Sequence, residues 1–270
     1  MVRTLDAPPL QDKELTAAVR FEAQNLIPMP LDQAVLDFQV LGPVETEEGP
    51  RTRVILIAAR RDMVERLVNA ARRAGLRPVG VDLSAFAMIR ALAPNADGPS
   101  SSGAVLYVNV AGLTNIAVAN GYTCLFTRTV AGGYDGLAGE LAERCGLTLQ
   151  HARQWLIHVG LVTAMTEIAG DEAIVAEART VISDGVRRIA DEARNSLDFY
   201  RASPDALPVE EAILCGPAVS VPGFTEELGA RIGVPVHEGN IAEARPGVLS
   251  DADADRVAIA AGLALEERAA

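Results

Sequence analysis

The chain has almost no lysine and few catalytic motifs. Lys13 is its single lysine, and no GxxxxGK[ST] motif occurs, so the sequence excludes a P-loop nucleotide site. The same scarcity excludes a protein-kinase site, which needs a strand lysine and an HRD loop. No GxSxG motif is present either, so a serine hydrolase with a nucleophile elbow has no support.

Cysteine and histidine are also scarce, with three of each. Cys124, Cys145 and Cys215 are far apart and odd in number, which argues against a disulfide framework and favours a reducing compartment. His151 and His158 lie two helical turns apart, so they are too far apart to share a metal ion. The net charge of −12 argues against a nucleic-acid partner.

Long apolar runs are missing. The longest, Val257 to Leu265, has nine residues and includes a glycine, whereas a membrane-spanning helix needs about 20. The N-terminus lacks the basic region and apolar core of a secretory signal. The sequence therefore predicts a cytoplasmic protein without a membrane span.

The 270 residues suffice for two compact parts, and charge is distributed unevenly between them. Residues 1–83 have a net charge of −1, and residues 84–270 a net charge of −11. The basic side chains of the first part form a cluster: Arg51, Arg53, Arg60, Arg61, Arg66, Arg72, Arg73 and Arg77. This cluster could contact an acidic partner segment or lipid head groups, or it could be an ordinary solvated helix face.

The pattern of residues 1–83 predicts a small mixed sheet with helices on one side, in the order β-α-β-β-α-β. The predicted elements are an extended segment at 3–8, a helix at 13–26, strands at 34–41 and 52–58, a helix at 62–74 and a strand at 78–83. An acidic loop is expected at 42–50. A helix from Ser84 to Pro94 precedes the loop-like stretch 95–103, NADGPSSSG, which is the best candidate boundary.

Residues 104–133 predict a meander of three strands at 104–110, 114–119 and 122–129. Asn120-Gly121 favours a type I′ turn between the last two strands. Small residues at the bend after Val110 would let backbone N–H groups approach a ligand, often a phosphate. A tight hairpin without a ligand is the alternative interpretation.

The remaining chain predicts an α/β part that binds a ligand at its strand ends. Helices are expected at 135–145, 148–159, 172–201, 224–231 and 253–265, and strands at 209–215 and 234–236. In the helix 172–201, apolar residues from Ile182 to Tyr200 recur at spacings of three and four, which indicates one buried stripe.

Two stretches resemble the PilM family of type IV pilus assembly machines. They are Glu14 to Leu41 (ELTAAVRFEAQNLIPMPLDQAVLDFQVL) and Asn195 to Arg201 (NSLDFYR) followed by AILCGPAVSVPGF. The resemblance runs from about Leu5 to Leu265. It implies an α/β fold of the two-lobed actin-like (sugar kinase/Hsp70/actin) type. In this arrangement 1–83 would be the inserted subdomain that PilM shares with FtsA, 84–102 a first-lobe remnant and connector helix, and 103–270 the second lobe, with 135–205 as its outer helical subdomain.

The resemblance also implies a partner. Proteins of this family bind the N-terminal cytoplasmic tail of the membrane protein PilN in a groove against the inserted subdomain. We place that groove near Phe21, Ile27, Met29 and Phe38, and ordinary core packing is the alternative for each. The implied role is a scaffold among other pilus platform proteins, held at the inner face of the cell membrane through its partner.

Binding of ATP and Mg²⁺ between the lobes is the other implication of the resemblance. The matching positions are Asn109, Gly112, Thr114, Gly132, Gly133 and Gly216. Only Met1 to Thr4 precede the matching region, so the first phosphate loop of the family is expected to be absent. Asn109 stands where the family has an aspartate and so loses the attraction for a hydrated Mg²⁺. Pro217 interrupts the glycine run of the adenine loop and removes a backbone donor.

These departures predict that ATP binding is degraded or lost and that the chain has no catalytic residues. An active actin-like ATPase is one alternative. An FtsA-like, membrane-tethered filament former is another, although the polar ending EERAA does not read as an amphipathic tail.

Overall fold

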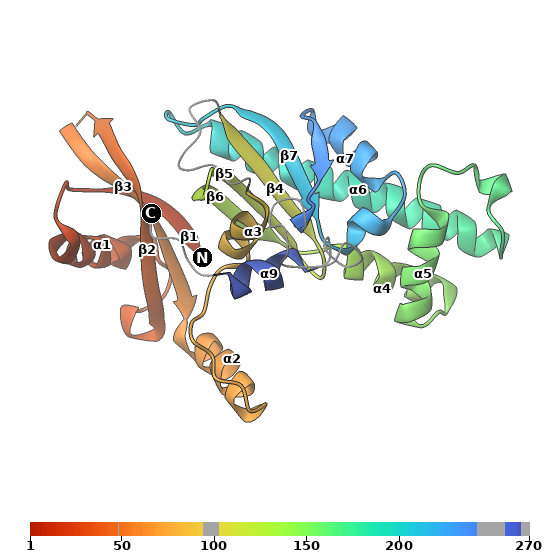
Figure 1. The fold of residues 1–270 in the computed structure, drawn as a ribbon, viewed down its shortest axis with the longest axis horizontal. Coiled ribbons are helices and arrows are strands. Elements are labelled where there is room, and N and C mark those ends of the chain that lie inside the picture. Colours follow the sequence, from red (N-terminus) through yellow and green to blue (C-terminus); the bar gives the residue numbers. More distant parts are fainter. Residues whose placement is uncertain (48, 94–102, 242–256, 266–270) are drawn as a thin grey trace. The chain divides into compact units, whose positions relative to one another are not determined.

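The computed structural model describes residues 1–47, 49–93, 103–241 and 257–265. Its chain divides into two compact units, Met1–Asp82 (unit 1) and Leu83–Ala270 (unit 2) (Figure 1). Most of the predicted boundary 95–103, the start of the predicted helix 253–265 and the ending EERAA lie outside the described residues.

Unit 1 is a three-stranded antiparallel sheet with two helices. Its elements are β1 (Val2–Ala7), α1 (Asp12–Leu26), the short 3-10 helix η1 (Leu31–Gln33), β2 (Ala34–Thr46), β3 (Gly49–Arg60) and α2 (Arg61–Arg73). The strand order is β1-β3-β2. Leu15, Val19 and Ala23 repeat every four residues on α1, so they share one face. They are buried with Val54 and Leu56 of β3 in the core of this unit.

Two predictions for unit 1 are wrong. The expected acidic loop 42–50 belongs mostly to a long hairpin, because β2 and β3 extend beyond the predicted strands and stay paired from Ala34↔Arg60 to Thr46↔Gly49. The expected strand 78–83 does not form. Pro78 has no N–H to donate, and Val79 is 99% exposed, so the segment has no buried face that would hold it in a sheet. Unit 1 therefore has the order βαββα, and its sheet is antiparallel and not mixed as predicted.

Unit 2 is built on a five-stranded mixed sheet in the order β6-β5-β4-β7-β8. The strands are β4 (Ala104–Val110), β5 (Thr114–Asn120), β6 (Thr123–Val130), β7 (Val209–Cys215) and β8 (Val236–Glu238). The helical elements are α3 (Ser84–Leu92), α4 (Tyr134–Cys145), α5 (Leu149–Val159), η2 (Met165–Glu167), α6 (Glu172–Arg201), η3 (Pro217–Ser220), α7 (Phe224–Ile232) and α9 (Ala258–Ala264). Strands β4, β5 and β6 form the predicted antiparallel meander, and β7 and β8 continue the sheet in parallel.

The turn between β5 and β6 differs from the predicted type I′ turn. Asn120 is the last residue of β5 and pairs with Thr123, so the turn residues are Gly121 and Tyr122. Gly121 has a φ of 55°, and no described residue other than glycine has a positive φ. A type I′ turn needs positive φ at both central residues, so it is excluded here.

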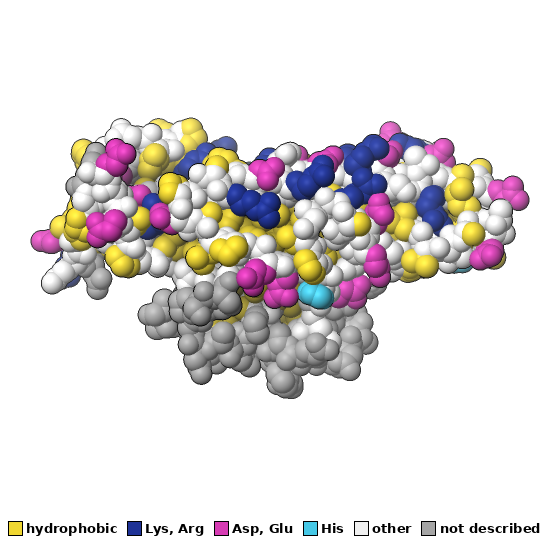
Figure 2. Space-filling model, turned by 90° about the horizontal axis from the view of Figure 1, so that it is seen from above, with side chains coloured by type: hydrophobic (Ala, Val, Ile, Leu, Met, Phe, Trp, Pro, Cys, Tyr) yellow, Lys and Arg dark blue, Asp and Glu magenta, His cyan; other side chains and the backbone are white. Residues whose placement is uncertain are grey.

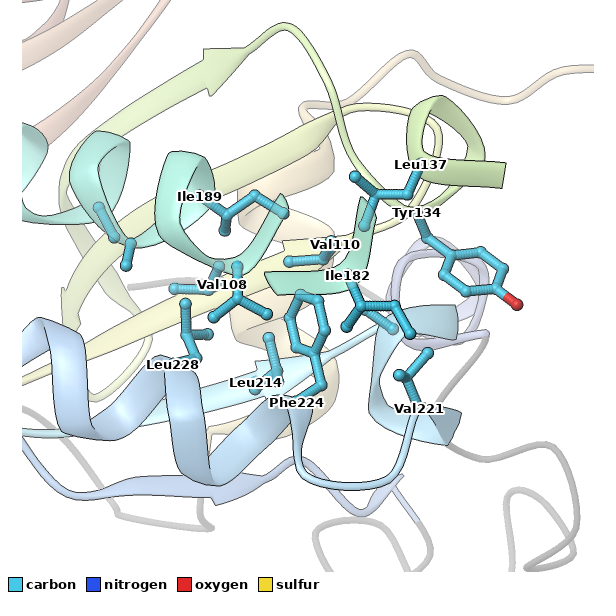
Figure 3. Packing of buried hydrophobic residues seen from close by; sticks show 14 of the residues in the cluster. Val108, Val110, Tyr134, Leu137, Ile182, Ile189, Leu214, Val221, Phe224 and Leu228 are labelled. Atoms are coloured by element: carbon cyan, nitrogen blue, oxygen red, sulfur yellow. The ribbon is translucent and has the colours of Figure 1, made fainter. Parts of the chain in front are cut away.

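The main core of unit 2 lies between the sheet and α6 and α7. Figure 3 shows Val108 and Val110 of β4 and Leu214 of β7 directed toward Ile182 of α6 and Phe224 of α7. The opposite side of the sheet carries α3 and α9 (Figure 1). Burial on both faces explains why the central strand β4, AVLYVNV, is apolar except at Asn109.

Helices α3 and α9 pack in close contact. A Cβ on Gly262 of α9 would lie 1.7 Å from the carbonyl oxygen of Ala87 of α3. Arg90 Nε also donates a hydrogen bond to the carbonyl of Gly262 at 2.9 Å. Glycine is therefore required at this crossing because the two backbones nearly touch.

The solvent side of α6 carries exposed ion pairs at i,i+3 spacing: Arg187–Asp184, Arg194–Asp191 and Arg201–Asp198. Figure 2 shows one face of the molecule, on which basic side chains lie among acidic and apolar ones. Such exposed pairs contribute little to stability. None of the described helices combines the length and the apolar character needed to cross a bilayer.

Candidate functional site

The ends of β4 and β7 meet at one end of the sheet of unit 2. Asn109 of β4 is in register with Cys215 of β7, and Gly216 follows directly. A Cβ on Gly216 would lie 2.7 Å from Asn109 Oδ1 and 2.8 Å from the carbonyl oxygen of Val110. Gly216 also has a φ of 94°, which side chains of L-residues rarely permit. Only glycine therefore lets the chain leave β7 this close to β4.

A second close approach lies beside the first. A Cβ on Gly133 would lie 2.4 Å from the carbonyl oxygen of Ala111. The same oxygen accepts a hydrogen bond from the amide of Asp135 at 3.2 Å. Thr114 Oγ1 donates to the carbonyl of Gly132 at 2.9 Å. The Gly132-Gly133 segment is thus held against the bend between β4 and β5.

The structure brings the predicted nucleotide-site residues to one end of the sheet. We call this group the glycine cradle; it consists of Asn109, Gly112, Thr114, Gly132, Gly133 and Gly216. Of its four glycines, only Gly132 has no protein atom within 4 Å of the position that a Cβ would take; at Gly112, Gly133 and Gly216 that position faces other atoms of the protein. The hydroxyl of Thr114 is already used inside the protein. Nucleotide binding by these residues stays a prediction.

Asn109 has an unusual environment. It is 4% exposed, and its Oδ1 has no hydrogen-bond partner in the described part of the chain. Tyr107, two residues earlier on the same face of β4, is buried too. That burial, with smaller effects of Glu211 and Tyr122, raises the tyrosine's pKa well above its ordinary value. The burial of Asn109 itself disfavours a charged side chain at this position.

Asp135 and Arg153 were missed by the sequence analysis. A Cβ on Gly112 would lie 3.3 Å from Asp135 Oδ2, so this carboxylate stands beside the bend. Arg153 Nη2 of α5 lies 2.8 Å from Asp135 Oδ1. The sequence could have indicated Asp135 as a site residue, because Asp135 lies in the first turn of a predicted helix shortly after Gly132-Gly133. No such indication existed for Arg153, because the ion pair forms only when α4 packs against α5.

The predicted nucleotide site requires backbone groups that reach phosphate oxygens and ligands that hold Mg²⁺. Within the described residues, no group of three or more His, Cys, Asp or Glu side chains could hold a metal ion. Asn109 offers an uncharged amide oxygen in place of the carboxylate that the family resemblance implies, and carboxylates are the protein groups through which Mg²⁺ is usually bound.

The four predicted partner residues of unit 1 do not form one exposed surface. Ile27, which follows α1, is 6% exposed and belongs to the core. Met29 and Phe38 are partly buried against that same core. Phe21 of α1 is 65% exposed. Phe21 alone presents a largely open side chain, and a partner role for the four residues stays a prediction.

Comparison with known proteins agrees with this architecture. The family model described as type IV pilus assembly protein PilM matches residues 3–268. The chain is similar to a solved structure of a PilM-PilN type IV pilus biogenesis complex, with 28% identity over 98% of this chain and 75% of that chain and a TM-score of 0.77. It is also similar to MreB5 of Spiroplasma citri bound to ADP, with 13% identity over 76% of this chain and 64% of that chain and a TM-score of 0.55, which shows the fold alone.

These similarities confirm the predicted α/β fold of the actin-like type. The family model spans nearly the whole chain. This protein therefore belongs to the PilM family of type IV pilus assembly proteins.

Proposed function

We propose that this chain is a cytoplasmic scaffold of a type IV pilus platform and that it binds the N-terminal tail of a PilN-like membrane protein. The observation that carries the proposal is the similarity to a PilM-PilN complex over 98% of this chain. The tail would hold the protein at the inner face of the membrane and beside other platform proteins. This fits the finding that no described helix could span a bilayer.

The proposed tail-binding surface lies on unit 1, which we propose corresponds to the inserted subdomain of the family. Phe21 is its best candidate for direct contact, because a largely exposed aromatic ring can become buried on binding. Ile27 is already buried, so it would not contact the tail directly and would only support the surface residues from the core. Replacing Ile27 would damage the core and would not test binding cleanly.

Calorimetric titration of the full chain with an N-terminal peptide of a PilN-like protein tests this proposal. We expect binding by the wild type and an affinity loss of about tenfold or more for Phe21→Ala, equivalent to about 1.4 kcal/mol. Phe199 of α6 is a matched control, because it is an exposed phenylalanine of unit 2. Phe199→Ala should bind as the wild type does. Absence of binding at millimolar peptide, or an equal loss in both variants, would contradict the proposal.

We further propose that nucleotide binding in this chain is degraded and that hydrolysis is lost. The support is the neutral, buried Asn109 in the cradle, together with Pro217 directly after Gly216. An active ATPase is the competing function. Phosphate release from Mg²⁺-ATP should stay at the level of a protein-free blank. Turnover by the wild type that disappears in Asn109→Ala, at an unchanged melting temperature, would establish the ATPase instead.

A further inference from the structure

Helix α2 has an open surface. None of its residues is buried, although the helix contacts β2 and β3. Val64, Val68 and Ala71 are half-buried and repeat at i, i+4 and i+7, so they mark the least exposed side of the helix. The rest of the helix circumference lies exposed.

An apolar stripe runs along the exposed part of α2. Met63 and Leu67 are 47% and 59% exposed, and Ala70 and Ala74 continue the stripe at i+7 and i+11. The chain that follows adds further exposed apolar side chains: Leu76, Val79 and Val81. Large exposed apolar patches on soluble proteins mark interaction sites. We therefore expect this stripe to contact a binding partner.

Arginines flank this stripe. Arg66 and Arg73 follow Met63 and Ala70 by three residues, so each lies beside the stripe on the helix surface. Between Arg60 and Arg77 there are six arginines and two acidic residues, a local net charge of +4 in a chain whose total is −12. Basic charge is therefore concentrated beside the exposed apolar side chains.

Half of these six arginines have no polar partner among the described residues. Arg60 and Arg66 pair with Asp62. The guanidinium groups of Arg72, Arg73 and Arg77 make no hydrogen bond or ion pair within the described residues. Such groups can bind phosphate in a bidentate manner.

We propose that α2 and residues 76–81 dock on the surface of an anionic lipid bilayer. We call this region the α2 surface. Its stripe would lie at the boundary of head groups and acyl chains, and its arginines would bind lipid phosphates. A bilayer offers an apolar layer and a dense array of phosphates together, which matches both properties of the α2 surface. The proposal does not depend on a PilN-like partner, because it requires only lipid.

Flotation of the full chain with protein-free vesicles tests the proposal. We expect the protein to float with mixed phosphatidylglycerol–phosphatidylcholine vesicles and not with phosphatidylcholine alone. Each arginine near a membrane surface changes binding by about fivefold. The triple variant Arg72→Gln, Arg73→Gln, Arg77→Gln should therefore lose affinity for the mixed vesicles by roughly a hundredfold.

A second triple variant controls for total charge. Arg187→Gln, Arg194→Gln and Arg201→Gln remove the same charge from the exposed side of α6, so this variant should float like the wild type. The double variant Met63→Ser, Leu67→Ser tests the apolar stripe. It should weaken flotation several-fold and leave the melting temperature unchanged, because both side chains are exposed.

Three results would overturn the proposal. One is failure of the wild type to bind the mixed vesicles. Another is equal binding by both arginine triple variants. The third is self-association in light scattering that the α2 variants abolish while vesicle binding is absent, since the α2 surface would then be covered by a second copy of the chain.

Discussion

Replacing Gly216 by alanine tests whether the end of β7 packs against β4 as closely as the structure shows. Gly216 has φ 94° and ψ 174°, a region that is essentially restricted to glycine, and forcing alanine into it destabilises by about 1–3 kcal/mol. The new Cβ would also lie 2.7 Å from Asn109 Oδ1 and 2.8 Å from the carbonyl of Val110. Relieving that overlap requires a backbone shift, which adds about 1–3 kcal/mol. We expect a total loss of about 2–6 kcal/mol.

Tryptophan fluorescence provides the assay. Trp155, the single tryptophan of the chain, lies in α5 of unit 2, so its emission follows the unfolding of the unit that contains Gly216. For a unit of this size, each kcal/mol lowers the melting temperature by about 2–4 °C. The expected decrease for Gly216→Ala is therefore on the order of 10 °C.

Gly139→Ala is the matched control for this experiment. Gly139 lies within α4, and a Cβ there would meet no atom within 4 Å. Alanine at this position should stabilise the helix by about 0.5–1 kcal/mol. If Gly216→Ala melted at the wild-type temperature while Gly139→Ala melted higher, the packing argument at the cradle would be refuted.

Three further predictions concern other parts of the chain. Gly262→Ala should destabilise unit 2 by about 2–3 kcal/mol in thermal unfolding, because its Cβ would lie 1.7 Å from the Ala87 carbonyl; an unchanged midpoint would contradict the α3–α9 contact. Hydrogen bonds from Arg53 hold the pKa of Asp6 below its usual 3.8. The stability that Asp6 contributes, about 1 kcal/mol, is therefore full above that value and is lost as the pH falls through the folded-state pKa; the difference in urea midpoint between wild type and Asp6→Asn should shrink over that range. Burial raises the pKa of the Cys124 thiol to about 12, so iodoacetamide at neutral pH should label it, by mass spectrometry, only after unfolding.

Much of the secondary structure of unit 2 could be predicted because its signals are local. The predicted helix 172–201 and strand 209–215 coincide with α6 and β7. In α6, the spacing of apolar residues follows the helical repeat over many turns, so the whole pattern indicates a single helix. The helix predicted at 148–159 forms α5, and its first residue, Thr148, caps it by accepting a hydrogen bond from the amide of His151.

The errors in unit 1 came from features that depend on partners distant in sequence. Residues 78–83 have the composition of a strand, but no sheet edge pairs with them. The segment 42–50 is polar and acidic, yet it pairs within a hairpin whose exposed faces tolerate charge. Strand formation depends on pairing, which composition alone does not reveal.

The sequence by itself determined the family, the α/β class, the long helix α6 and the identity of the small residues at the strand ends, because motifs, helical periodicity and turn residues act over short stretches of chain. Only the tertiary structure decided that Gly216 lies against Asn109, that Asp135 pairs with Arg153, and that Phe21 is exposed while Ile27 is buried. Each of these facts depends on how segments far apart in the chain pack together. A packing contact is a property of two surfaces, and neither surface alone specifies it.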